Sequence, residues 1–86
     1  MINLLIAEDQ AMLLTTLATI LDLEDDIKVV HQSPDGQDAL DFLSNSDNSP
    51  VDIVITDIEM PRMTGIELIQ NIQSKRLAIK SIIVTT

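Results

Sequence analysis

Short apolar runs alternate with amphipathic segments along the 86 residues of this chain. Four runs rich in Ile, Val and Leu, at residues 2–7, 27–31, 51–56 and 80–86, are typical of strands in a parallel sheet. Three segments between them, residues 10–23, 38–44 and 65–74, carry apolar residues at spacings of three and four, which predicts helices. This alternation predicts an α/β fold of right-handed βαβ units around a parallel sheet.

The pattern also predicts which positions lie inside. The first, third and fourth runs are the most apolar and are expected at the centre of the intact sheet. The second contains Lys28 and His31, which indicates an edge strand and makes His31 a solvated edge residue. Asp9 is expected as the N-cap or a first-turn acid of the first helix. The helix positions expected to face inward are Ala11, Met12, Leu13, Leu14, Leu17, Ala18, Ile20 and Leu21, then Ala39, Leu40 and Leu43, then Ile66, Leu68, Ile69 and Ile72.

Composition narrows the class of protein. The chain is at most one small domain, and its 45% apolar content favours a packed core over disorder. It has no cysteine, which excludes disulfides, thiolate metal ligands and a cysteine nucleophile. The net charge of −9, with scattered cations, argues against direct contact with nucleic acid. The first apolar run meets Glu8 and Asp9 too soon for a signal peptide or a membrane span, so we expect a cytoplasmic chain without membrane contact.

Oxygen-bearing side chains follow three of the predicted strands. Glu8 and Asp9 come after the first, Asp57 after the third, and Thr85 lies near the end of the fourth. Taken singly, each has an ordinary explanation as a helix start, a turn residue or a strand former. Together they fall at the carboxyl ends of parallel strands, where α/β sheets bind ligands. Clustered carboxylates favour a hard divalent cation such as Mg²⁺, and a carboxylate beside that metal can be a phosphoryl nucleophile.

Several of these motifs together resemble a known family. They are the acidic pair Glu8-Asp9, the pair Asp35-Gly36, the run at residues 57–61 completed by Gly65, and the sequence at residues 82–85. This combination is similar to the receiver domain of bacterial two-component response regulators, in the version joined to a LuxR-type (NarL class) helix-turn-helix output domain. The resemblance implies a flavodoxin-like, doubly wound parallel sheet.

The resemblance also implies roles for individual residues. Asp57 would accept a phosphoryl group from a phosphohistidine of a sensor histidine kinase. Asp9 and Asp57 would bind Mg²⁺ by their side chains, Glu8 largely through water, and Glu59 by its backbone carbonyl. Thr85 would be the switch residue that contacts the phosphoryl group. Such a domain is a signalling phospho-acceptor that catalyses its own phosphorylation and dephosphorylation, rather than an enzyme with a separate substrate.

The chain departs from the family pattern after the switch threonine. Family members continue with a fourth helix, a fifth strand that ends in a phosphate-pairing lysine, and a fifth helix, whereas this sequence stops at Thr86. We therefore expect residues 1–86 to be the N-terminal part of a receiver domain, without the output domain. The fourth strand would then be an exposed edge and one sheet face would be uncovered, which predicts self-association through either surface.

Two other functions stay open from the sequence. The chain could be a receiver-derived interaction module that no longer transfers phosphate, and Mg²⁺-dependent phosphate uptake at Asp57 would separate it from a phospho-acceptor. A phosphohydrolase of the haloacid dehalogenase type also uses a strand-end aspartate, with a second acid two residues later, where Glu59 stands. The Pro61 and Gly65 pattern fits that family poorly. Turnover of a small phosphomonoester would favour it.

Overall fold

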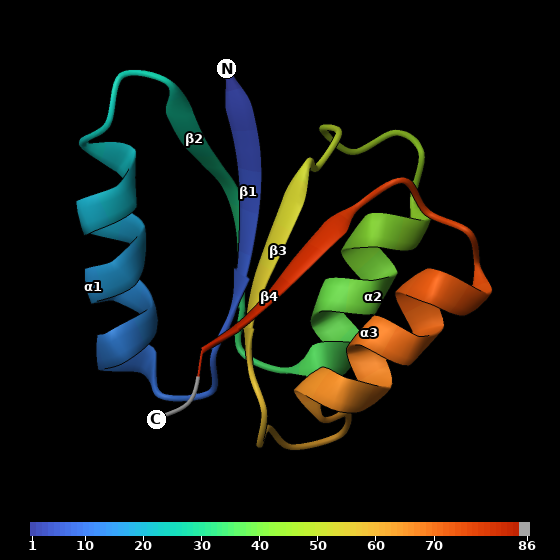
Figure 1. The fold of residues 1–86 in the computed structure, drawn as a ribbon. Helices are drawn as coiled ribbons and strands as arrows, with labels where there is room; N and C mark the ends of the chain where they lie inside the picture. Colours follow the sequence, from blue (N-terminus) through green and yellow to red (C-terminus); the bar gives the residue numbers. More distant parts are fainter. Residues whose placement is uncertain (85–86) are drawn as a thin grey trace.

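A single four-stranded parallel sheet with three helices forms the structure, a computed structural model that describes residues 1–84 (Figure 1). The strand order is β2-β1-β3-β4. The elements follow one another as β1 (Ile2–Ala7), α1 (Ala11–Asp22), β2 (Ile27–Ser33), α2 (Gly36–Ser44), β3 (Ile53–Asp57), α3 (Gly65–Ser74) and β4 (Lys80–Val84).

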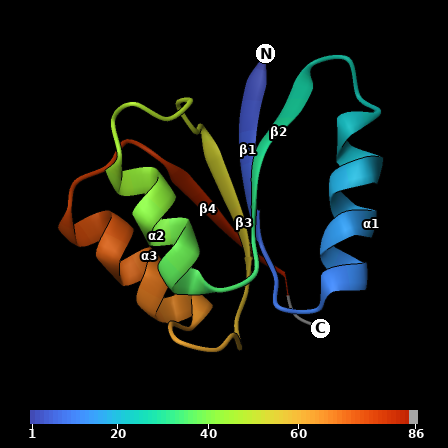
Figure 2. The ribbon, with the colours of Figure 1, turned by 180° about the vertical axis from the view of Figure 1, so that it is seen from behind.

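The helices cover both faces of the sheet. α1 lies on one face, and α2 and α3 lie side by side on the other, as the two opposite views show (Figures 1 and 2). The chain reverses its direction of winding between β1 and β3, so these two strands flank the topological switch point. The predicted α/β, flavodoxin-like doubly wound sheet is confirmed.

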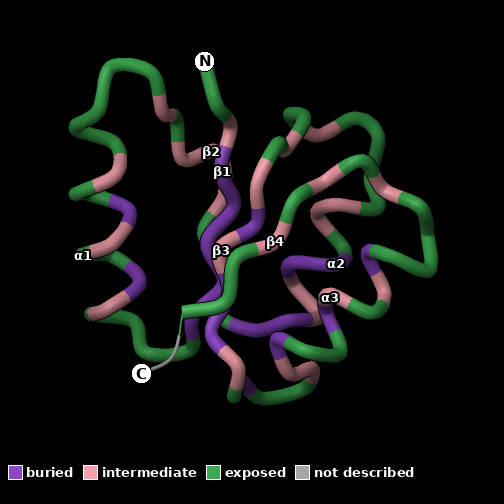
Figure 3. The backbone as a smooth tube through the Cα atoms, in the orientation of Figure 1, coloured by how far each residue is buried: buried purple, intermediate pink, exposed green. Residues whose placement is uncertain are grey.

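The two edge strands of the described sheet are β2 and β4, as predicted from the sequence. β2 pairs only with β1, and its register shifts by one residue opposite Leu4 and Leu5. β4 pairs only with β3, with Ile82 opposite Ile55 and Val84 opposite Asp57. The apolar residues of β4 are exposed, as the green tube of this strand shows (Figure 3). β1 and β3 are the central strands and contain most of the buried strand residues.

Two apolar clusters pack against the two faces of the sheet. The larger joins Leu5 and Val54 of the central strands to Leu68 and Ile72 of α3 and to α2. The smaller joins Ile6 to Leu14 and Ala18 of α1. Alternation along the strands explains this division, since Leu5 and Ile6 point to opposite faces. Within residues 1–84, no helix has the length and apolar character needed to cross a lipid bilayer.

Several predicted inward positions face solvent instead. Met12 is 84% exposed, and Ile20 and Ile66 are also exposed, as is Ala11. The reason is helical geometry: two residues along a helix turn the side chain by about 200°. Met12 therefore points away from the buried Leu14, and Ile20 away from the buried Ala18. In α3, Ile66 stands in the same relation to the buried Leu68.

The helix starts also correct two expectations. Gln10, not Asp9, is the N-cap of α1, and no side-chain cap hydrogen bond or first-turn acid is present there. Asp9 stays in the connection, where the Gln10 N–H donates to the Glu8 carboxylate at 3.0 Å. α2 begins two residues earlier than predicted because Asp35 caps it by accepting the Asp38 N–H at 2.8 Å.

His31 is half-buried rather than a solvated edge residue. Its ring stacks on the Phe42 ring with centroids 4.1 Å apart, and its Nε2 lies 2.8 Å from Asp38 Oδ1. Both partners belong to α2, which crosses the sheet beside β2. The expectation failed because the strand pattern alone does not show which helix packs over an edge strand.

Candidate functional site

Three carboxylates meet at the carboxyl ends of β1 and β3. Ala7 pairs with Thr56 in the parallel ladder, so the residues that follow each of them, Glu8 and Asp57, emerge from the sheet side by side. One carboxylate oxygen of each of Glu8, Asp9 and Asp57 lies within 4.8 Å of the other two. The sheet's topological switch point therefore carries the predicted acidic cluster.

The three carboxylates differ in their surroundings. Glu8 is 3% exposed and Asp57 is 8% exposed, whereas Asp9 is open to solvent. Burial raises the pKa of the Glu8 carboxyl, and the neighbouring Asp9 and Asp57 carboxylates add to that rise, while the hydrogen bond from the Gln10 N–H opposes it. The cause is loss of water around a charge that already has like charges nearby. A bound cation would relieve both costs.

The donor set suits a hard divalent cation. All three candidate ligands are carboxylate oxygens, with no nitrogen or sulfur donor among them. Such a set favours Mg²⁺ or Ca²⁺ over zinc or copper, and Mg²⁺ commonly takes one or two protein carboxylates while it keeps several waters. The exposed side of Asp9 leaves this cluster accessible from solvent.

The connection between β3 and α3 (residues 58–64) is the second part of the site. It starts with the Ile58 N–H, which donates to Asp57 Oδ1 at 2.8 Å, and it closes where the Gly65 N–H donates to the Ile58 carbonyl at 2.7 Å. A Cβ at Gly65 would collide with the Asp57 carbonyl, so only glycine allows this close return. Glu59 is exposed in the connection, and Met60 beside it is buried.

Of the four side chains predicted to converge, the structure brings three together. Thr85 and its neighbour Thr86 lie outside the described residues. The residue that pairs with Asp57 on β4 is Val84, which places the end of β4 next to the end of β3. The backbone carbonyl of Glu59 belongs to the connection just described, and its role as a ligand stays a prediction.

Sequence reasoning missed an ion pair that joins two connections of this rim. Arg62 Nε donates to Asp35 Oδ2, and its terminal NH₂ nitrogen donates to Asp35 Oδ1, both at 3.1 Å. The Asp38 N–H and then the Arg62 guanidinium hold the pKa of the Asp35 carboxyl below its usual value. A turn aspartate and a cation 27 residues later offer no sequence signal for such a pair. The positions look ordinary until the fold joins them.

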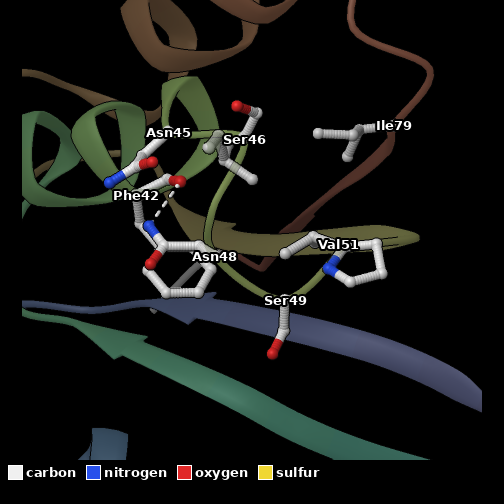
Figure 4. Close-up of a pocket in the computed structure, with 9 residues that line it drawn as sticks. Phe42, Asn45, Ser46, Asn48, Ser49, Val51 and Ile79 are labelled. Carbon is white, nitrogen blue, oxygen red and sulfur yellow. Dashed lines mark hydrogen bonds between the residues drawn. The ribbon is translucent and has the colours of Figure 1, made fainter.

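A cavity of about 280 Å³ lies elsewhere in the molecule (Figure 4). It is lined by Phe42 and Leu43 of α2, the polar residues that follow them, Val51 and Ile79. Val51 precedes the start of β3 and Ile79 the start of β4, whereas the carboxylates stand at the carboxyl ends of β1 and β3. Asn48, one of the lining residues, donates from its side-chain amide to the Phe42 carbonyl at 3.0 Å. The cavity is therefore separate from the acidic cluster.

Comparison with known proteins agrees with this geometry. The family model of the response regulator receiver domain matches residues 4–86. The chain belongs to the response regulator receiver family. Receiver domains are the phosphate-accepting modules of two-component signalling, and acceptance of phosphate on an aspartate is their general function.

Relatives of this receiver domain include transcriptional regulators. It is 48% identical over 86 residues to the transcriptional regulatory protein DesR of Bacillus subtilis and 42% identical over 86 residues to the uncharacterized transcriptional regulatory protein YvfU of the same organism. All of the chain is matched in both cases, but only 41% and 42% of the relatives. The chain thus spans less than half the length of these proteins.

Solved structures show the same fold. The LuxR-family DNA-binding response regulator of Staphylococcus aureus superposes with a TM-score of 0.89 at 40% identity, over 100% of this receiver domain and 69% of that chain. The response regulator domain of Thermotoga maritima CheB superposes with a TM-score of 0.85 at 32% identity, over 98% of this chain and 60% of that one. The same receiver fold is therefore found in a DNA-binding response regulator and in CheB.

Proposed function

We propose that Asp57 is the phospho-acceptor of this receiver domain, and that Asp9, Asp57 and the backbone carbonyl of Glu59 hold Mg²⁺, with Glu8 acting largely through water. The observation that carries the proposal is the meeting of three carboxylates within 4.8 Å at the topological switch point. A divalent cation binds favourably to such a cluster of carboxylate oxygens, because it offsets the repulsion between the buried Glu8 carboxylate and its neighbours.

Two features support Asp57 as the nucleophile. It ends a buried central strand, so its position is fixed by the ladder, and the Ile58 N–H orients one of its oxygens. In the proposed reaction the P–O bond to an Asp57 carboxylate oxygen forms as the P–N bond of a phosphohistidine breaks, and the leaving imidazole takes up a proton. The chain's own side chain is the substrate, so a separate substrate site is not required.

Mg²⁺ would offset the negative charge that phosphoryl transfer gathers on the phosphoryl oxygens. The role of the protein's own residues is to hold the carboxylates close together. The Glu8 carboxylate is fixed by the Gln10 N–H, and the Gly65 N–H closes the connection that carries Glu59. Thr85 would supply a hydroxyl to the phosphoryl group and act as the switch, the role that the resemblance to receiver domains implies for it.

Membership of the receiver family supports a partner, and the names of the relatives support an output. We propose that a sensor histidine kinase supplies the phosphoryl group, and that in the whole protein this domain controls a DNA-binding output domain of the LuxR type. Two relatives are transcriptional regulatory proteins, and the Staphylococcus aureus structure is a LuxR-family DNA-binding regulator. The acidic receiver itself, at a net charge of −9, would make no direct contact with DNA.

Incubation of the chain with acetyl phosphate tests the proposal. We expect intact-mass spectrometry to show one added phosphoryl group, and we expect that adduct to require both Mg²⁺ and Asp57. Asp57→Asn is the matched control, because it keeps the shape of the side chain and removes the nucleophilic carboxylate. A folded wild-type chain that acquires no phosphate would instead favour the interaction module.

Self-association is a second property that the exposed strand favours. β4 is an edge of the described sheet, and its Ile82, Ile83 and Val84 are 49%, 38% and 37% exposed. We propose that the 86-residue chain pairs through this edge or its apolar face. Light scattering at micromolar concentration should show an oligomer that Ile82→Lys weakens. A monodisperse wild-type monomer would contradict this part of the proposal without touching the phosphorylation chemistry.

A further inference from the structure

The ion pair between Asp35 and Arg62 joins two connections that are far apart in the sequence. Arg62 Nε donates to one carboxylate oxygen of Asp35 and Arg62 Nη2 donates to the other, each at 3.1 Å. A bidentate pair of this kind fixes orientation as well as distance. Asp35 itself is anchored, because its Oδ1 also accepts the Asp38 N–H and thereby caps α2. The carboxylate is therefore a fixed point to which Arg62 is attached.

Arg62 lies in the connection between β3 and α3 with a left-handed backbone, at φ 68°. Residues other than glycine rarely adopt this conformation, and glycine adopts it without penalty. The backbone alone would thus favour glycine at position 62. The ion pair that the Arg62 side chain forms with Asp35 offsets this backbone cost.

Backbone packing reinforces the same junction. A Cβ on Gly36, the first residue of α2, would collide with the Met63 carbonyl, so the start of α2 lies directly against the connection. Met63 is also held from the other side, where its N–H donates to the Pro61 carbonyl at 2.7 Å. The connection is therefore held by contacts at residues 62–63, three to four residues beyond Glu59.

We infer that Asp35 and Arg62 are positioning residues of the phosphorylation site: the start of α2, through this ion pair, holds the β3–α3 connection in the shape that presents the Glu59 carbonyl beside Asp57. This inference rests on the proposed function, since it assigns the pair to the Mg²⁺ site. Neither residue belongs to the acidic cluster, so the pair acts only through the connection.

The test is Mg²⁺ affinity, measured by isothermal titration calorimetry well below the unfolding temperature of each variant, with folding checked by circular dichroism. Arg62→Gln removes the guanidinium fork, and Asp35→Asn removes the charge while keeping an oxygen that can cap α2. We expect each variant to weaken Mg²⁺ binding about two- to fivefold, the fold-change that the small free energy of an exposed ion pair can supply. Arg62→Lys should recover only part of the affinity, because lysine lacks the planar fork.

Two further variants separate positioning from general stability. Arg62→Gly relieves the left-handed backbone, so it should fold at least as well as wild type and still bind Mg²⁺ as weakly as Arg62→Gln. Arg76 is the matched control: it is also an arginine with positive φ, at 55°, but it follows α3 away from the site. Arg76→Gln should bind Mg²⁺ as the wild type does.

A double-variant cycle completes the design. Asp35→Asn combined with Arg62→Gln should be no weaker than either single variant, because both remove one interaction. Wild-type affinity in a folded Arg62→Gln variant, or fully additive losses in the double variant, would overturn the inference while leaving the proposed function intact. A wild-type chain that binds no Mg²⁺ would contradict the proposed function and this inference with it.

Discussion

Two buried carboxylates of this domain have pKa values displaced in opposite directions. Burial and the nearby Asp9 and Asp57 raise the pKa of Glu8, whereas the Asp38 N–H and Arg62 lower that of Asp35. Glu8 lies in a cluster of like charge, and the negative charge of Asp35 is already matched inside the protein. At the residue scale, a bound cation would therefore stabilise the charged form of Glu8, whereas Asp35 already has a cationic partner and serves as an anchor for Arg62.

The Asp35 pair makes a pH-dependent prediction. Its folded-state pKa is below the usual value of 3.8, so its stabilisation is present above that value and is lost as pH falls through the lower folded-state pKa. Because the Arg62 side chain is 61% exposed, Asp35→Asn should lower the free energy of unfolding at neutral pH by only about 0.5–1 kcal/mol. Urea unfolding followed by circular dichroism measures this difference, which should disappear once the pH has fallen below the folded-state pKa of Asp35. A gap of constant size at all pH values would contradict the assignment.

Not every residue of the site was visible in the sequence. Glu8, Asp9 and Asp57 could be predicted because each follows a strongly apolar strand, and parallel strands bring their carboxyl ends to one edge. The Asp35–Arg62 pair could not, because it depends on where α2 starts and on a left-handed residue in a connection. His31 was misjudged for a similar reason, since its partners, Phe42 and Asp38, come from a helix packed over the edge.

At the scale of elements, the strands were predicted more accurately than the buried faces of the helices. The bounds of β1 and α3 match the predicted ones, and those of α1, β2, α2 and β3 differ by one or two residues at one or both ends. β4 begins at Lys80 as predicted, and its predicted end lies outside the described residues. Strand runs are punctuated by proline, glycine and acids, which mark their ends in the sequence. The prediction made the buried face of α1 too wide, because Met12 and Ile20 are apolar yet lie opposite the packed stripe of Leu14 and Ala18.

A pair of substitutions in α1 tests which side is packed. Leu14→Ala removes a side chain from the smaller core cluster and should lower the free energy of unfolding by about 2 kcal/mol, the low end for buried leucines. Met12→Ala alters a side chain that is 84% exposed and should change that free energy by less than about 0.5 kcal/mol. Thermal unfolding by circular dichroism gives both values. Equal losses would mean that α1 packs through a wider face.

At the scale of the whole molecule, topology is what makes a site from separated sequence. Glu8 and Asp57 are 49 residues apart in the chain, yet they emerge side by side because β1 and β3 are neighbours in the order β2-β1-β3-β4. The price of this arrangement is repulsion among the carboxylates when no cation is bound. Stability and metal binding should therefore be coupled.

That coupling predicts that Mg²⁺ reverses the order of stability of the wild type and the Asp57→Asn variant. In EDTA, Asp57→Asn should be at least as stable as the wild type, because it removes one of three clustered charges. With Mg²⁺ at about one hundred times its dissociation constant, binding should add about 2.7 kcal/mol to the wild type and much less to the variant. Thermal unfolding with EDTA or Mg²⁺ tests this, with Asp47→Asn, in the loop before β3, as a distant control. An unchanged rank would contradict the metal site.

The central claim is that Asp57 is the residue that takes the phosphoryl group, and its chemistry allows the position to be read out. Borohydride reduces an acyl phosphate on aspartate to homoserine, so peptide mass spectrometry after treatment with acetyl phosphate and Mg²⁺ identifies the modified residue. The account predicts homoserine at position 57 and none when Mg²⁺ is withheld. Modification at Glu8 or Asp9 instead, or an unmodified Asp57 in a folded chain with Mg²⁺ present, would contradict it.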